Sequence, residues 1–332
     1  MKKLSDYAVV MDEDKYHAKK CLSYSILANY ERNERFKSLP DNWSDLWKPT
    51  PKTDALIFGG AVDAILTGGQ DKFISEYKVV DIPAVQDKVK QVIDKMVELG
   101  IGWNESDKIM SLLDEIQFYP NWRKDTRMSK ISEGKAYYDA ISGEDKRIVM
   151  TSDMYENVMR VCNDLHNSKL VSSLMFDELP EGKERFFQLK FIDDVYGIRF
   201  KIMCDMIIVD HNKKQIQIYD LKTTGKESYL FKHSYLDWGY HIQSWMYRIT
   251  LREALSLTEY DEYNIEGFYF IVASKVGGLP TVWKDESELS GNKYRNPITI
   301  AKEIVSSYDN DGYRKPMPKW CSSDEVNILN FE

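Results

Sequence analysis

The chain has 332 residues, of which 43% are hydrophobic and 30% are charged, and its formal net charge is −8. This size and balance are typical of a globular protein with a well-buried core, and no apolar run reaches the ~20 residues that a membrane-spanning helix needs. The acidic balance argues against a protein coated with basic side chains for unspecific nucleic-acid binding, but a local basic groove is compatible with it.

The first half of the chain, from residue 20 to about 180, has the hydrophobic period of helices. Ser23 or Ser25 can cap a first helix that continues through Tyr30, and a loop rich in proline and tryptophan follows at 40–51. Further helices are predicted over five segments: 56–66, 83–100, 106–118, 121–142 and 152–168.

Near residue 185 the period changes to that of strands. Three segments rich in β-branched and aromatic residues are predicted strands, joined by turn-forming sequences: 186–192, 198–209 and 215–221. An amphipathic helix is then expected at 236–255, and two strands and a short helix complete the pattern: 265–273, 281–283 and 298–306.

This order of elements predicts an α/β architecture in one domain over residues 1–332. The part at 1–183 is expected to be mainly helical. The core, at 184–310, is expected to contain a small central mixed sheet flanked by helices, and an irregular tail follows at 311–332.

The cysteines and the N-terminus bear on the compartment. No two cysteines form a CxxC pair, so we expect free thiols in a reducing cytoplasm: Cys21, Cys162, Cys204 and Cys321. The first residues have two lysines but no apolar region behind them, so we expect no secretory signal.

Asp220, Leu221 and Lys222 close the third predicted strand. Because side chains alternate along a strand, Asp220 and Lys222 share one face. The predicted hairpin brings Asp205, from the preceding strand, near Asp220. Two carboxylates can bind a divalent cation, and a lysine beside them can orient the attacking water. The same triplet is also common in solvated turns, so its interpretation depends on the neighbouring motifs.

The helix after this strand has Tyr240, Gln243 and Tyr247 at positions i, i+3 and i+7, which places them on one face. The alternative is that both tyrosines pack in the core and Gln243 lies at the surface. Between strand and helix, Thr223 and Thr224 can donate to phosphates or cap the next segment.

Taken together, Asp205, Asp220-Leu221-Lys222 and Gln243-x-x-x-Tyr247 resemble the core motif of the RecB-like branch of the PD-(D/E)XK nucleases. Within that branch, Phe58-Gly59 and the spacing from Gly197 to Asp205 most resemble the RecE-type and phage recombination exonucleases. The resemblance covers roughly residues 20 to 275. It includes an S-x-S-x-L segment at 22–27 and a segment at 59–63 that is similar to a G-x-x-x-H helix.

The resemblance implies a restriction-endonuclease-like fold and a DNA nuclease that depends on Mg²⁺ or Mn²⁺. The implied metal ligands are oxygen donors, with Asp63 at the place of the usual histidine: Asp205, Asp220, the Leu221 carbonyl and Asp63. The implied catalytic set is completed by three side chains: Lys222, Gln243 and Tyr247. The implied contacts with nucleic acid are these: Ser23, Ser25, Thr223, Thr224 and Tyr240. Relatives often have a glutamate in the strand before Asp205, and either Glu184 or Gln188 can occupy that position here.

The implied function is an exonuclease that resects linear duplex DNA in phage-type recombination, in the cytoplasm of a bacterial host cell. Its expected partners are DNA, a single-strand annealing protein and further copies of the chain, without a membrane. A structure-specific endonuclease or a host-DNA-degrading nuclease is the alternative within the class. The competing class is a non-catalytic nucleic-acid-binding protein with a nuclease-like fold. Cys321 stands alone near the C-terminus, so the iron–sulfur cluster of some relatives is not expected.

Overall fold

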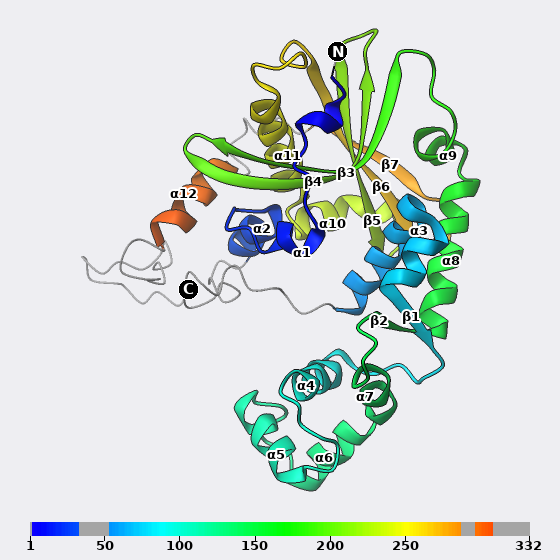
Figure 1. Ribbon diagram of the computed structural model, residues 1–332, viewed down its shortest axis with the longest axis vertical. Helices are drawn as coiled ribbons and strands as arrows, with labels where there is room; N and C mark the ends of the chain where they lie inside the picture. Colours follow the sequence, from blue (N-terminus) through cyan, green and yellow to red (C-terminus); the bar gives the residue numbers. More distant parts are fainter. Residues whose placement is uncertain (1, 33–52, 287–295, 308–332) are drawn as a thin grey trace, which may run out of the picture. The chain divides into compact units, whose positions relative to one another are not determined.

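The computed structural model describes residues 2–32, 53–286 and 296–307, which form two compact units (Figure 1). Unit 1 combines Met1–Pro49 with Ser168–Glu332, and unit 2 is Thr50–Asn167. The first segment of the chain therefore packs with the C-terminal half instead of with the helices that follow it. The expected division at residue 184 does not coincide with this one, and the single domain over the whole chain stays a prediction.

Unit 1 is built on a sheet whose five described strands have the order β3-β4-β5-β6-β7. β3, β4 and β5 are antiparallel neighbours, β5 and β6 are parallel, and β7 returns antiparallel to β6. The strands have these bounds: β3 Lys183–Val195, β4 Ile198–Asp210, β5 Gln215–Thr224, β6 Asn264–Ser274 and β7 Thr281–Asp285. The α/β class, the mixed sheet and the two predicted hairpin turns are thus confirmed.

The long helix α11 (Tyr240–Leu255) packs against β3, β4 and β6, and α2 (Tyr24–Arg32) and α12 (Pro297–Ser307) pack against α11 (Figure 1). The remaining helices of this unit are short: η1 Leu4–Tyr7, α1 Glu13–His17, α9 Lys169–Met175, η3 Ser228–Leu230 and α10 Phe231–Asp237. Alternate residues of the strands point toward the helices and form a core of aromatic and aliphatic side chains. Its largest fully buried members include Phe191, Phe200, Phe268 and Phe270.

Unit 2 has a two-stranded parallel sheet, formed by β1 (Tyr77–Val80) and β2 (Ile148–Thr151), with the helices α3 (Asp54–Glu76) and α8 (Ser152–Asn167) packed on it. Four shorter helices surround a separate apolar core: α4 Asp87–Glu98, α5 Ser106–Glu115, α6 Lys124–Ser132 and α7 Lys135–Ile141. The pairing of β1 with β2 was not predicted.

Two predicted helices are each divided in the structure, both at a glycine. The segment 121–142 forms α6 and α7, which meet at Gly134. A Cβ at Gly134 would lie 2.1 Å from Cδ1 of Ile93, so the backbone can approach α4 only without a side chain. The segment 236–255 forms α10 and α11, which are separated by Gly239 with φ of 67°. A residue with a left-handed backbone conformation ends α10 and precedes α11. The prediction of one continuous helix was therefore wrong for each of the two segments.

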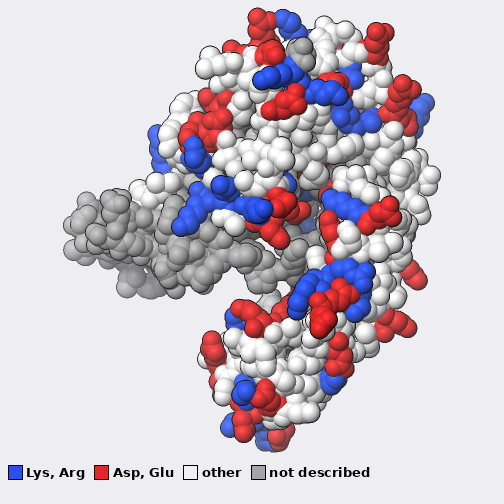
Figure 2. Space-filling model, viewed as in Figure 1, with Lys and Arg blue, Asp and Glu red and all other residues white. Residues whose placement is uncertain are grey.

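The visible surface carries charges of both signs, and the described cysteines are free thiols. On the face that Figure 2 shows, lysine and arginine are interspersed with aspartate and glutamate and do not form one continuous basic surface. Three of the four cysteines lie in the described part, and all three are buried free thiols: Cys21, Cys162 and Cys204. Cys321 and the loop at 40–51 lie outside the described residues. No described helix combines the length and apolar character needed to span a bilayer.

Candidate active site

Asp205 and Asp220 lie where β4 and β5 separate. The last pair of the β4–β5 ladder is Met206 with Tyr219, so the two aspartates are the next residues on each strand. At this point the backbone N–H of Leu221 donates to Asp205 Oδ2, at 2.8 Å, and not to a carbonyl of β4. The predicted hairpin therefore does bring the two carboxylates to one level of the sheet.

Beyond this point the N-terminal segment covers the edge of β4. Leu22 bridges to Phe200, and its backbone bonds to Arg199 and Lys201 are both 2.9 Å long. The buried ammonium of Lys201 donates to the carbonyls of Tyr16, His17 and Lys19, at 3.1, 2.7 and 3.0 Å. These bonds fix the chain that leads into α2, so residues from both ends of unit 1 surround the place where the strands separate.

Asp220 is buried and contacts two partners. Its Oδ1 accepts a hydrogen bond from Nε2 of Gln243, at 2.6 Å, and its Oδ2 lies 2.5 Å from Nζ of Lys222. The second contact is an ion pair. Gln243 is itself buried, so the alternative that placed it at the surface is wrong. The strand and the helix therefore converge on one carboxylate.

The charges around Lys222 keep it an ammonium. Burial alone would lower the pKa of Lys222, but Asp220, Tyr240 and Asp205 together outweigh burial, and the pKa is raised. The Nζ atom lies 5.0 Å from the centre of the Tyr240 ring, a distance typical of a cation–π contact. Lys222 can therefore orient an anion or a water molecule, and it cannot accept a proton near neutral pH.

Tyr247 lies on the same face of α11 as Gln243 and remains a neutral phenol. Burial raises the pKa of Tyr247 well above its ordinary value, and Tyr16, Asp220, Cys204 and Asp205 raise it further. The proximity of Tyr16 was not predicted, because the five-residue helix α1 has too few residues for a periodic signal.

Tyr240 connects the site to the start of α2. Its ring stacks on Phe231, with centroids 5.5 Å apart, and lies 6.1 Å from the ring of Tyr24. The hydroxyl of Tyr24 donates to the Trp238 carbonyl at 2.7 Å. The side chains of Ser23 and Ser25, the two residues that flank Tyr24 in the sequence, are 3.0 Å apart and share a hydrogen bond. The two serines thus lie at the end of α2 that packs beside Tyr240.

Of the two residues considered for the strand before Asp205, Gln188 is the one that lies opposite Asp205. Glu184 pairs with Val209, and its Oε2 lies 3.1 Å from Nε2 of His211. Gln188 occupies the position opposite Asp205, where the β3–β4 ladder is interrupted and φ is 54°. The residue opposite Asp205 on β3 is therefore an amide and not a carboxylate.

Thr223 and Thr224 lie at the end of β5, opposite Ala273 and Ser274 of β6. The hydroxyl of Thr224 accepts a hydrogen bond from the N–H of Lys226 at 3.1 Å, so it stabilises the turn after the strand. This bond favours the capping alternative for Thr224, and the role of either threonine in binding nucleic acid stays a prediction.

Two further features lie in unit 2. Asp63 is in α3, where its backbone carbonyl accepts a hydrogen bond from Thr67 Oγ1 at 2.8 Å, and its role as a metal ligand stays a prediction.

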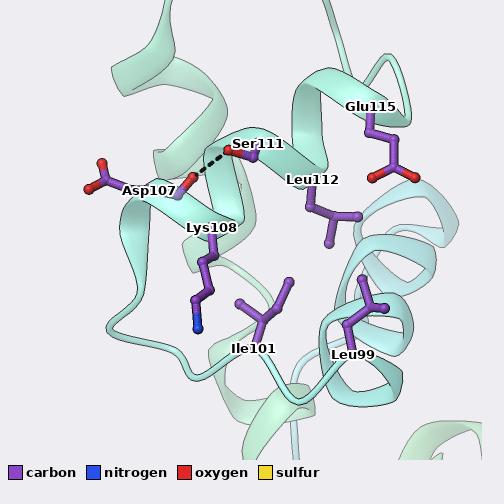
Figure 3. Close-up of a pocket in the computed structure, with 7 residues that line it drawn as sticks. All are labelled: Leu99, Ile101, Asp107, Lys108, Ser111, Leu112 and Glu115. Atoms are coloured by element: carbon purple, nitrogen blue, oxygen red, sulfur yellow. Dashed lines mark hydrogen bonds between the residues drawn. The ribbon is translucent and has the colours of Figure 1, made fainter.

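Leu99, Ile101 and Leu112 line an open hollow of about 320 Å³ with polar residues at its rim (Figure 3). None of its lining residues belongs to the predicted site.

The donor set of unit 1 fits a hard divalent cation that keeps part of its water. Asp205, Asp220 and the carbonyl of Leu221 supply oxygen atoms, and Mg²⁺ is often bound by one or two carboxylates together with substrate phosphates. Within the described residues, no three or more His, Cys, Asp or Glu side chains are grouped closely enough to hold a metal. Two carboxylates and one carbonyl would leave coordination positions for water or a substrate phosphate.

The chain has little similarity to known proteins. No protein-family model matches it, and no curated protein matches it. Among solved structures, the chain is similar to a crystal structure of a putative exonuclease from Eubacterium rectale. The two share 13% identity with a TM-score of 0.44, over 90% of this chain and 83% of that one. At this level the similarity assigns neither a family nor an activity.

Proposed function

We propose that the chain is a metal-dependent deoxyribonuclease with its centre at Asp205, Asp220 and Lys222. The observation that carries the proposal is the contact of Asp220 with both Lys222 and Gln243, beside Asp205, where β4 and β5 separate. Taking the Asp220 carboxylate and much of the Lys222 side chain out of water costs free energy, so stability alone does not account for this ion pair. A buried carboxylate beside a lysine with a raised pKa makes the end of this strand a candidate catalytic site.

The side chains divide the work as follows. Asp205, Asp220 and the Leu221 carbonyl would hold Mg²⁺ or Mn²⁺, and Gln243 holds the Asp220 carboxylate in its orientation. A cation held there would lower the pKa of a water molecule and stabilise negative charge on the phosphate. Lys222 offsets the charge that develops on the phosphate oxygens as water attacks phosphorus and the bond to the leaving oxygen breaks. Tyr247 packs behind this set and keeps bulk water away from it.

Within this class we propose an exonuclease that resects linear duplex DNA in phage-type recombination, in the cytoplasm of a bacterial cell. It would act as a homo-oligomer and pass a single strand to an annealing protein. The support is the order and spacing of the motifs between Ser23 and Tyr247. A structure-specific endonuclease or a host-DNA-degrading nuclease is the alternative.

A comparison of two forms of one plasmid tests this proposal. In the same Mg²⁺ buffer, the linearised form should be degraded progressively to small products while the covalently closed circle survives, because an exonuclease needs a DNA end. Chelation of the metal should stop the degradation. Rapid nicking or linearisation of the closed circle would instead support the endonuclease.

Gln188 offers a test of how the metal is bound. Gln188→Glu places a third carboxylate opposite Asp205, so the Mg²⁺ concentration for half-maximal cleavage should fall about 3- to 10-fold, since the charge of the ligands sets the affinity. The matched control is Glu184→Gln, which removes a carboxylate from the same strand beside His211 and should leave the Mg²⁺ titration unchanged. An unchanged titration for Gln188→Glu would remove this residue from the site.

A further inference from the structure

The segments that follow β5 and β6 form one ridge beside the candidate active site. The two strands are parallel and end together at Thr224 and Ser274, only two residues (about 7 Å) beyond Lys222. The N–H of Lys275 donates to the Thr224 carbonyl at 2.7 Å. Ser228 is buried, and its hydroxyl donates to the Leu279 carbonyl at 2.7 Å. We call residues 226–229 and 275–279 the strand-end ridge.

The ridge exposes three large apolar side chains. Tyr229 is 62% exposed, Val276 is 61% exposed and Leu279 is 77% exposed. Their backbone is held in place by the bonds of Lys275 and Ser228, so the side chains are presented to solvent from a fixed support. Apolar surface gathered in this way on one feature is a sign of a binding site.

The charge on the ridge is positive although the chain as a whole is acidic. Within the ridge, the two lysines Lys226 and Lys275 outnumber the one carboxylate, that of Glu227. Two lysines and an exposed aromatic ring on one surface suit a polyanion with flat bases. Lysine is depleted in the cores of protein–protein interfaces, which disfavours a second protein as the occupant.

We propose that the strand-end ridge binds the nucleic-acid strand whose phosphate is cleaved. Tyr229 stacks on an unpaired base, Val276 and Leu279 pack on neighbouring bases, and Lys226 and Lys275 neutralise phosphates on either side. The inference rests on the proposed nuclease function and adds the surface on which that substrate lies. It also gives the strand a direction of approach, from the ends of β5 and β6 toward Lys222.

The first test measures binding of a fluorescein-labelled single-stranded oligonucleotide by anisotropy, with Ca²⁺ in place of Mg²⁺ so that the probe stays intact. The variant Tyr229→Ala with Leu279→Ser should raise Kd about 5- to 30-fold, as the loss of base stacking usually does. The control is Tyr196→Ala with Val10→Ser, which changes similar residue types elsewhere in unit 1, where they are 69% and 97% exposed. This control should change Kd less than twofold.

The second test measures the salt dependence of the same binding. Lys226→Gln with Lys275→Gln should reduce the slope of log Kd against log salt by about 0.7 for each phosphate that a lysine no longer neutralises. Lys19→Gln with Lys213→Gln removes two exposed lysines away from the ridge and should leave the slope unchanged.

The outcomes separate this inference from the nuclease proposal. If wild-type protein cleaves DNA and the ridge variants bind the probe as tightly as it does, the ridge inference is wrong and the nuclease proposal stands. If the ridge variants change the elution volume in gel filtration and leave Kd unchanged, the ridge is an interface between copies of the chain. If wild-type protein cleaves no DNA, the failure lies in the proposed function. The variants change side chains that are exposed or, at Lys275, half-buried, and thermal unfolding should confirm that they fold.

Discussion

Asp220→Asn should lower the rate of DNA cleavage by about two orders of magnitude or more, the usual effect of losing a metal ligand. The substitution keeps the shape of the side chain and an oxygen that can accept the Gln243 hydrogen bond. It removes the negative charge that would bind the cation and that now pairs with Lys222. The measurement is the initial rate on an end-labelled linear duplex at saturating Mg²⁺.

Asp220→Asn should also lower the stability of the protein, because it leaves the Lys222 ammonium without its nearest counter-charge. We expect the free energy of unfolding to fall by about 1–3 kcal/mol, less than for a fully buried pair, because the Lys222 side chain is partly exposed. Asp194→Asn is the matched control, since Asp194 pairs with Arg199 on the surface of the same sheet. The control should keep full activity; a wild-type rate for Asp220→Asn would place catalysis elsewhere.

Lys222→Met should lower turnover about 100-fold or more while changing DNA affinity less than threefold. The ammonium interacts with charge that develops on the phosphate in the transition state, so its loss affects kcat more than KM. Methionine fills a similar volume under the Tyr240 ring. Lys213→Met, in the turn at the other end of β5, is the control and should leave both constants unchanged.

The same variant has a second signature. Without Lys222, the buried Asp220 carboxylate loses its neighbouring cation, so added Mg²⁺ should raise the melting temperature of Lys222→Met more than that of wild type. A collapse of DNA affinity with normal turnover on saturating DNA would instead make Lys222 a phosphate clamp.

The parts of the site that depend on short-range pattern could be predicted. The period of two places Asp220 and Lys222 on one face, and the turn-forming sequence at 210–214 sets the register that brings Asp205 beside them. Helical spacing likewise places Gln243 and Tyr247 together. In each case the signal lies within a few residues or one hairpin.

Features set by contacts between distant segments could not be predicted. The break at Gly134 depends on the approach of α4, more than thirty residues earlier in the chain, which no local period reveals. The parallel pair β1–β2 joins strands of four residues each, with α4 to α7 between them.

The most direct test of the proposed centre is the cleavage of one end-labelled linear duplex by wild-type protein and by the double variant Asp205→Asn with Asp220→Asn. Both proteins are assayed side by side in Mg²⁺ and in excess chelator. We expect cleavage by wild type in Mg²⁺ only, and none by the double variant under either condition. Equal cleavage by both proteins in Mg²⁺, or cleavage by wild type that persists in chelator, would contradict a metal-dependent nuclease centre at Asp205 and Asp220.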